Sequence, residues 1–87
     1  MKIDYSKRFI KQLRKSPKHV QLAFAERLEL FIGDRSHALL HNHTLHGTLS
    51  GYRSINITGD WRAIYAELEN GSVLFFEMLG THSELYG

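Results

Sequence analysis

The chain has 87 residues, of which 43% are apolar and 23% charged, with a formal net charge of +2 and no cysteine. This length predicts one small domain, and this composition is that of a folded protein rather than a disordered chain. The absence of cysteine excludes disulfide bonds and thiolate metal sites. The sequence has no apolar signal segment at its start and no stretch near the ~20 residues that span a bilayer, so we expect a cytoplasmic protein without membrane contact.

Residues 1–5 alternate weakly between apolar and polar side chains, which is typical of a short edge strand. Ser6 follows in the position of a helix N-cap, and we expect a helix over residues 7–15. Phe9 and Leu13 lie four residues apart in this helix, so one apolar face is available for packing.

Positive charge is concentrated in this first part of the chain. Seven cations fall within the first eighteen residues, where Asp4 is the only acid. They are Lys2, Lys7, Arg8, Lys11, Arg14, Lys15 and Lys18. Such a run is usually the solvated face of a helix, and it is also a surface that attracts phosphate. Charge alone leaves both interpretations open.

Ser16 and Pro17 predict the start of a second helix, with the serine as its cap and the proline at its first position. Gly33 marks its end. The apolar residues between them recur every three or four positions, which predicts an amphipathic helix whose stripe packs against the rest of the domain. The stripe consists of Val20, Ala23, Phe24, Leu28, Phe31 and Ile32.

Residues 34–50 are predicted to form a turn and a loop whose leucines pack on the core, namely Leu39, Leu40, Leu45 and Leu49. The same segment holds His37, His41, His43 and His46. His37 and His41 would share one face of a helix, whereas His41 and His43 would share one face of a strand. No single secondary structure meets both spacings. Without cysteine beside them, we expect exposed loop histidines, no metal site and no cofactor.

Strands are predicted over residues 52–57, 60–68 and 73–79. The first two are joined at Thr58-Gly59. Asn70-Gly71 joins the last two and is a strong signal for a two-residue hairpin loop.

The loop length decides which residues of the last two strands face each other. A two-residue loop places Tyr65 opposite Phe76 and Ala63 opposite Met78. These four side chains are expected on the sheet face that receives the helices.

One extra residue in the turn before the second strand places Ile55 and Ile57 on this helix-facing side as well. Strict alternation puts Arg53 there too, so a role for it in a site requires an irregular start of its strand. The opposite face is expected to be lined by Asn56, Arg62, Ile64, Phe75 and Glu77.

His82 is the strongest candidate for proton transfer, because imidazole exchanges protons near neutral pH. Arg62 and Arg53 are candidates for holding a phosphate. Metal-free RNA cleavage needs a base for the 2′-hydroxyl proton, an acid for the leaving 5′-oxygen and cations on the phosphate. These residue types suggest such chemistry on a nucleic acid. The alternative is that His82 is an exposed residue that only ends the last strand.

Asp60, Trp61 and Arg62 form a second candidate group. In a purely structural interpretation, Asp60 is a carboxylate in a turn, Trp61 packs in the core and Arg62 is a surface cation. In a functional interpretation, Arg62 holds the scissile phosphate. Phe75 and Tyr86 offer rings on which bases of single-stranded RNA can stack.

The chain resembles toxins of the RelE/ParE superfamily over nearly its whole length, and most closely their YafQ-like branch. The resemblance rests on a basic N-terminal helical hairpin and on the segments His43-x-Leu45-x-Gly47-x-x-x-Gly51-Tyr52-Arg53, Asp60-Trp61-Arg62-x-Ile64-Tyr65 and Gly80-Thr81-His82-Ser83-Glu84-Leu85. It implies an α+β fold of residues 1–87 as a single domain, with two N-terminal helices packed on one face of a small antiparallel sheet. It also implies a type II toxin–antitoxin operon and cleavage of messenger RNA on the translating ribosome.

The resemblance also assigns roles to single residues. His82 occupies the position of the family's principal catalytic histidine, and His43 and Asp60 match two further active-site positions. Tyr86 falls where the family has an aromatic residue near the C-terminus. The implied partners are a cognate antitoxin, the ribosome and mRNA, and the toxin–antitoxin complex becomes a candidate for binding operator DNA.

Asn56 departs from the YafQ-like pattern, which has a histidine three residues after the residue equivalent to Arg53. Asparagine hydrogen-bonds but does not exchange a proton, and residues 55–62 are more similar to HigB-type relatives. Asn56 stays a candidate for binding substrate, with Arg53, Phe75 and Tyr86. Two alternatives remain open: a ParE-like toxin that inhibits a topoisomerase, and a weakened toxin that serves as an antitoxin-binding regulatory subunit.

Overall fold

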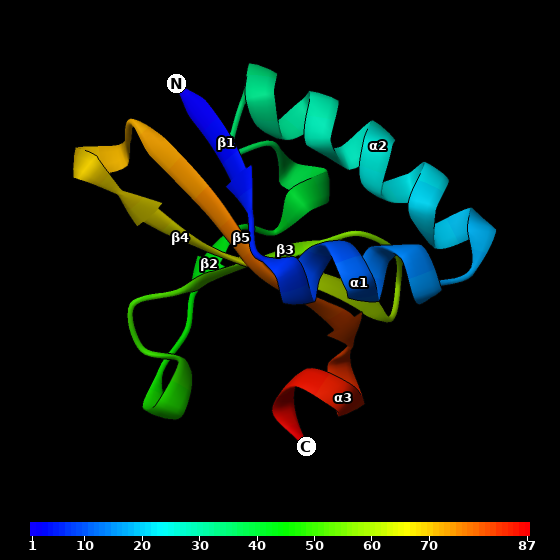
Figure 1. Ribbon diagram of the computed structural model, residues 1–87. Helices are drawn as coiled ribbons and strands as arrows, with labels where there is room; N and C mark the ends of the chain where they lie inside the picture. Colours follow the sequence, from blue (N-terminus) through cyan, green and yellow to red (C-terminus); the bar gives the residue numbers. More distant parts are fainter.

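Figure 1 shows the computed structural model, which describes all residues from 1 to 87. Five strands form one sheet in the order β1-β5-β4-β3-β2. The strands are β1 (Lys2–Tyr5), β2 (His43–Thr44), β3 (Arg53–Asn56), β4 (Trp61–Leu68) and β5 (Val73–Thr81). The helices are α1 (Lys7–Lys15), α2 (Lys18–Gly33) and α3 (His82–Tyr86), with short 3₁₀ turns at Ala38–Leu40, Gly47–Leu49 and Glu69–Gly71. None of these helices is long and apolar enough to cross a membrane.

The predicted α+β class is confirmed. α1 and α2 cover one face of the sheet, and α3 lies against the other (Figure 1). Strands β2 to β5 pair antiparallel, but β1 joins the edge of β5 in parallel, which the prediction of an antiparallel sheet did not include. Parallel pairing needs a long crossover, and two helices and three strands separate β1 from β5 in the chain.

α1 begins at the predicted cap, where the Ser6 side chain accepts a hydrogen bond from the Phe9 N–H at 2.9 Å. The Ser6 hydroxyl also donates to the Glu77 carbonyl at 2.7 Å, and the Leu79 N–H donates to the Gln12 side chain at 2.8 Å. Because β1 pairs only with the first part of β5, α1 covers the part of the β5 edge that β1 leaves open.

Ser16 has a different role from the predicted one. Its hydroxyl donates to the Leu13 carbonyl at 2.7 Å and closes the end of α1, whereas α2 begins after Pro17 without a side-chain cap. α2 ends at Gly33, as predicted. Ile32 is 53% exposed and does not belong to the packed stripe, because each residue turns the helix by about 100°. The fully packed members of the stripe are Val20, Phe24 and Phe31.

The loop after α2 buries one of its four leucines. Leu40 is fully buried, Leu45 and Leu49 are half-buried, and Leu39 is exposed. The prediction that all four pack on the core is wrong for Leu39, because neighbouring side chains of a 3₁₀ turn point about 120° apart.

Aromatic side chains dominate the core between the helices and the sheet. Phe76 of β5 is fully buried, and its ring centroid lies 5.4 to 5.8 Å from those of five other rings. These rings belong to Tyr5, Phe9, Phe24, Phe31 and Tyr65. Because the five come from β1, α1, α2 and β4, Phe76 joins the two layers of the fold.

The β4–β5 pairing follows the predicted register only in part. Tyr65 lies opposite Phe76, as predicted, but Ala63 lies opposite Leu79 and not opposite Met78. The difference comes from a β-bulge that adds one residue to β5 and shifts all pairs beyond it by one position.

Glu77 is the extra residue of this bulge. Its carboxylate pairs with the Arg8 guanidinium of α1 at 3.0 Å. This ion pair ties the β5 edge to α1, and the predicted place of Glu77 on the face opposite the helices stays a prediction.

The hairpin loop between β4 and β5 is longer than the predicted two residues. Leu68 and Val73 form the last pair, and Glu69, Asn70 and Gly71 between them all have positive φ angles of 50°, 58° and 85°. The Asn-Gly signal thus marks the turn correctly, but the left-handed backbone extends to Glu69.

The turn between β3 and β4 carries the predicted extra residue. Ile55 pairs with Ala63, and both lie in the core with Ile57. Trp61 packs against the same core from its rim. We call the opposite sheet face, which α1 and α2 leave uncovered, the open face. Its residues near α3 are Ser54, Asn56, Arg62, Ile64 and Met78.

Candidate active site on the open face

α3 carries His82 as its first residue, directly after β5. Thr81 caps this helix: its hydroxyl accepts from the Glu84 N–H at 3.2 Å, and its own N–H donates to the Glu84 carboxylate at 2.8 Å. The hydrogen bonds from the Thr81 backbone and hydroxyl lower the pKa of Glu84. Gly80 permits the close return of the helix, because atoms of Glu84 and Leu85 lie 3.3 to 3.4 Å from the place where a Cβ would stand. The capping box therefore fixes the position of His82 at the junction of β5 and α3.

Tyr86 links the last turn of α3 to β3, an inner strand of the sheet. Its hydroxyl donates to the Ser54 hydroxyl at 3.1 Å, and its ring lies edge-on to the His82 ring with centroids 4.7 Å apart. Ser54 is completely buried, whereas His82 stays exposed. His82 therefore stands at the rim of the open face with its ring accessible to a ligand.

His43 reaches the same face from β2. It is the cross-strand partner of Ser54, and directly opposite residues of an antiparallel pair point to the same side. Its Nδ1 lies 2.8 Å from the His41 carbonyl oxygen. A carbonyl oxygen only accepts, so Nδ1 carries the proton and the neutral ring has its lone pair on Nε2. This arrangement prepares Nε2 of His43 to act as a base.

Asp60 lies beside His82 where β4 begins. The His82 N–H donates to the Asp60 carbonyl at 2.9 Å. The Asp60 carboxylate is exposed and forms no ion pair. The backbone bond places the first residue of α3 next to the turn that carries Asp60, and a shared role of the two side chains stays a prediction.

Arg62 folds back over the turn between β3 and β4. Its guanidinium donates to the carbonyl oxygens of Thr58, Gly59 and Trp61 at 3.0 to 3.2 Å. These bonds hold the positive charge at the end of the sheet where Asp60 also lies. Further N–H groups of the guanidinium have no partner within the chain and can bind a phosphate oxygen.

Asn56 is the cross-strand partner of Arg62. Its side-chain oxygen is buried and has no hydrogen-bond partner. An unpaired buried acceptor costs about 1–3 kcal/mol of stability. A ligand or water that donates a hydrogen bond to the Asn56 oxygen would remove this cost.

Arg53 lies outside this group of residues, on the helix-facing side. Its Nε donates to the Asn42 side chain at 2.9 Å, and Asn42 donates to the Tyr65 hydroxyl at 2.7 Å. Burial raises the pKa of Tyr65, so this hydroxyl stays protonated at neutral pH. β3 starts without a bulge, so Arg53 lies on the helix-facing side, as strict alternation predicted, and its predicted binding of substrate stays a prediction.

Phe75 also lies apart from His82. It faces the open side, since it pairs with Ala66 next to the core pair of Tyr65 and Phe76. It belongs to the far half of β5, however, about 20 Å along the strand from α3. Its ring therefore does not share a ligand with His82 unless that ligand runs along the whole strand.

Three side chains of the open face were not singled out from the sequence as site residues: Ser54, Ile64 and Met78. Ser54 stands two positions before Asn56, so counting back along the strand with a period of two identifies it. α3 was also missed, although Thr81-x-x-Glu84 has the pattern of a capping box.

The loop histidines contribute one member to the open face. The His41 ring lies 4.8 Å from the His43 ring, and the His37 side chain accepts a hydrogen bond from the Leu39 N–H at 3.1 Å. No three histidine, aspartate or glutamate side chains converge in the way a metal ion requires.

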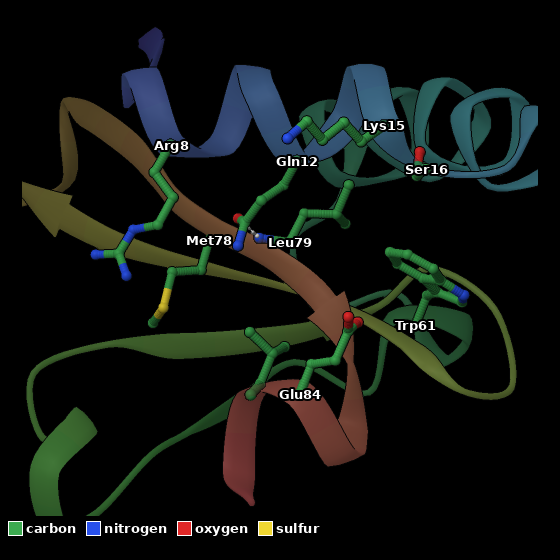
Figure 2. A pocket seen from close by; sticks show the side chains of 9 residues that line it. Arg8, Gln12, Lys15, Ser16, Trp61, Met78, Leu79 and Glu84 are labelled. Carbon is green, nitrogen blue, oxygen red and sulfur yellow. Dashed lines mark hydrogen bonds between the residues drawn. The ribbon is translucent and has the colours of Figure 1, made fainter.

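A groove of about 330 Å³ lies between α1 and α3, beside the open face (Figure 2). α1 contributes Arg8, Gln12 and Lys15, α3 contributes Glu84 and Leu85, and Trp61 closes one end. Neither His82 nor His43 lines it. The groove thus adjoins the candidate active site through α3.

The complete chain matches a family of known proteins. Residues 1–87 match the family described as a bacterial toxin of type II toxin-antitoxin system, YafQ. The chain belongs to this family. The predicted YafQ-like branch is thereby confirmed for this toxin.

Individual relatives agree with this placement. The mRNA interferase toxin YafQ of Escherichia coli (strain K12) is 38% identical over 50 residues, which is 58% of this toxin and 52% of that protein. The matched stretch therefore spans about half the length of that relative. The crystal structure of YafQ from E. coli strain BL21(DE3) has a TM-score of 0.81 at 28% identity and covers 98% of this chain and 97% of that chain. A chain of the E. coli DinJ-YafQ complex has a TM-score of 0.69 at 27% identity, with the same coverage of both chains.

Proposed function

We propose that this toxin is an mRNA interferase, a metal-independent endoribonuclease that cuts messenger RNA on the ribosome. The observation that carries the proposal is that two imidazoles belong to the sheet face that α1 and α2 leave uncovered. His82 of α3 packs on Tyr86, Tyr86 donates a hydrogen bond to Ser54, and His43 of β2 is the cross-strand partner of Ser54. Two groups that exchange protons near neutral pH meet the requirement for cleaving RNA with its own 2′-hydroxyl. The name of the E. coli relative, mRNA interferase toxin, supports the same activity.

In this mechanism Nε2 of His43 takes the proton of the 2′-hydroxyl, and the 2′-oxygen attacks the adjacent phosphorus. The bond from phosphorus to the 5′-oxygen breaks, and this oxygen takes a proton from the protonated ring of His82. The products are a 2′,3′-cyclic phosphate and a free 5′-hydroxyl. His43 ends with one proton more and His82 with one fewer, and exchange with water restores both.

Three neighbours assist the two histidines. Arg62 stabilises the negative charge of the phosphorane, because the turn carbonyls hold its guanidinium at this end of the sheet. The exposed carboxylate of Asp60, whose backbone carbonyl accepts from the His82 N–H, helps to orient the substrate or its protons. Asn56 binds the substrate by hydrogen bonds but transfers no proton.

The ribosome is proposed to position the substrate. The helical side of the toxin presents exposed cations that suit ribosomal RNA, namely Lys7, Lys11, Arg14, Lys15 and Lys18. The open face, by contrast, offers few groups that can read a base sequence.

We therefore expect the purified toxin to cut mRNA in the A site of programmed ribosomes and to cut free RNA poorly. The physical reason is that correct placement of the reacting groups supplies a large part of the rate. RNA ends mapped with and without ribosomes, at matched concentrations, measure the difference. Ribosome binding is expected to weaken as salt increases, because phosphate contacts release counterions.

The His82→Ala protein in the same reactions reports any contaminating nuclease. Naked RNA cut as fast as ribosome-bound mRNA, at the same sites, contradicts ribosome dependence. A toxin that leaves RNA intact on ribosomes and inhibits a DNA topoisomerase is instead the ParE-like alternative.

An antitoxin is proposed to cover the groove between α1 and α3. Lys15 at its border is exposed and forms no ion pair, so it suits an acidic segment that folds on binding. Glu84 and Leu85 line the same groove, so a segment placed there contacts α3 and covers or displaces His82. The DinJ-YafQ complex of E. coli supports a partner of this kind.

We expect complex formation to slow amide exchange in the α1–α2 hairpin, at an outer edge of the sheet and over residues 80–87. Hydrogen exchange followed by mass spectrometry, on the free toxin and on the complex, measures this protection. A complex in which all three regions exchange as in the free toxin rules out this mode of inhibition.

The remaining features of the proposal follow from the ribosomal substrate and the partner. A protein that cuts mRNA on ribosomes works in the cytoplasm. Residues 1–87 act as a single toxin domain, and the toxin–antitoxin complex is proposed to bind operator DNA.

A further inference from the structure

Ser54 lies between the two histidines of the candidate active site. It is fully buried on β3, which has strands on both sides. On one side it accepts the hydrogen bond of the Tyr86 hydroxyl at 3.1 Å, and on the other it is the cross-strand partner of His43. A buried residue of an inner strand is among the least mobile points of a small domain.

α3 needs such a fixed point. A helix of five residues is far too short to be stable alone. The capping box of Thr81 and Glu84 fixes its first turn, but these bonds are solvent-exposed. The hydrogen bond from Tyr86 to Ser54 ties the last turn of the helix to the sheet.

We infer that Ser54 is a positioning residue for His82. Its hydroxyl holds the Tyr86 ring, and the Tyr86 ring holds the His82 imidazole, whose centroid lies 4.7 Å away. Through this contact Ser54 sets where His82 stands relative to His43. The inference rests on the proposed function, and Ser54 acts through Tyr86 without touching the RNA.

The substitutions Ser54→Ala and Tyr86→Phe each remove the same hydrogen bond and test the inference. Tyr86→Phe keeps the ring, so any stacking of a base on Tyr86 is retained. We expect the single-turnover rate of mRNA cleavage at saturating toxin to fall by about 10-fold in each variant, less than the ~10²-fold that a 1 Å misplacement can cause. The toxin concentration at half-saturation should not change, because the phosphate-binding cations are intact.

The double variant Ser54→Ala/Tyr86→Phe should be no slower than the slower single variant, because both changes break one interaction. Tyr52→Phe is the matched control, since Tyr52 is half-buried and its hydroxyl bonds to no other residue. It should cleave at the wild-type rate.

A second measurement does not depend on activity. The Tyr86 ring current displaces the NMR signals of the His82 ring protons, and we expect these signals to move toward those of a flexible peptide in Ser54→Ala and in Tyr86→Phe. They should stay unchanged in Tyr52→Phe. If Ser54→Ala does not fold, Tyr86→Phe decides alone, because Tyr86 is 37% exposed and outside the core.

Wild-type His82 signals in Tyr86→Phe, together with a wild-type cleavage rate, overturn the inference. A wild-type toxin that does not cleave mRNA on ribosomes refutes the proposed function, and the NMR signals then still report whether Ser54 positions the His82 ring.

Discussion

The substitution His82→Ala is expected to abolish growth inhibition and to lower the rate of mRNA cleavage on programmed ribosomes by about 10²–10⁴-fold. Alanine removes the imidazole that donates a proton to the leaving 5′-oxygen. The side chain is exposed and takes no part in the core, so the variant should remain folded. Single-turnover cleavage rates measure the loss, and circular dichroism checks the fold.

His19→Ala provides the matched control, because His19 is also exposed but belongs to α2 on the covered side of the sheet. It is expected to retain the wild-type cleavage rate. If His82→Ala cleaves as fast as the wild-type toxin, His82 has no role in the reaction.

The substitution Phe76→Ala is expected to lower the free energy of unfolding by about 3–5 kcal/mol. Phe76 contacts rings from four elements, so its removal opens a cavity that no single neighbour can fill. Small domains are stable by only about 5–15 kcal/mol, and this change removes a large part of that stability. Urea unfolding followed by circular dichroism gives the midpoint and the slope.

Ile32→Ala serves as the control for this second change, since Ile32 is exposed on α2 and its truncation should alter stability by no more than about 0.5 kcal/mol. Phe76→Leu leaves a smaller cavity and keeps the loss measurable if Phe76→Ala is unfolded in buffer. A loss below about 1.5 kcal/mol in Phe76→Ala would show that the neighbouring rings collapse into the cavity.

Local patterns were sufficient for several elements of this fold. Ser6 as an N-cap, with Phe9 and Leu13 four residues apart, predicted α1, and the apolar stripe before Gly33 predicted α2. The position of His82 after the last strand was also evident, as was the turn at Asn70-Gly71. Each of these signals involves residues within one or two turns of each other, where backbone hydrogen bonds and side-chain spacing act directly.

The candidate site was only partly predictable for the same reason. His82, His43, Asp60 and Arg62 were named from their chemistry and from the resemblance to toxins, and the structure places them at one end of the open face or on it. Arg53 had the right chemistry, but the regular pairing of β3 turns it toward Asn42 and the core.

Residue types and short-range spacing in this chain thus specify the α+β elements and the chemistry available to them. Tertiary structure decided the parallel place of β1, the bulge at Glu77 and the bond that joins Tyr86 to Ser54. These features depend on contacts between residues far apart in the chain, whose register changes with one added residue. The spacing of apolar residues, with a period of two in strands and 3.6 in helices, contains no information about such pairings. They depend on how the whole core packs.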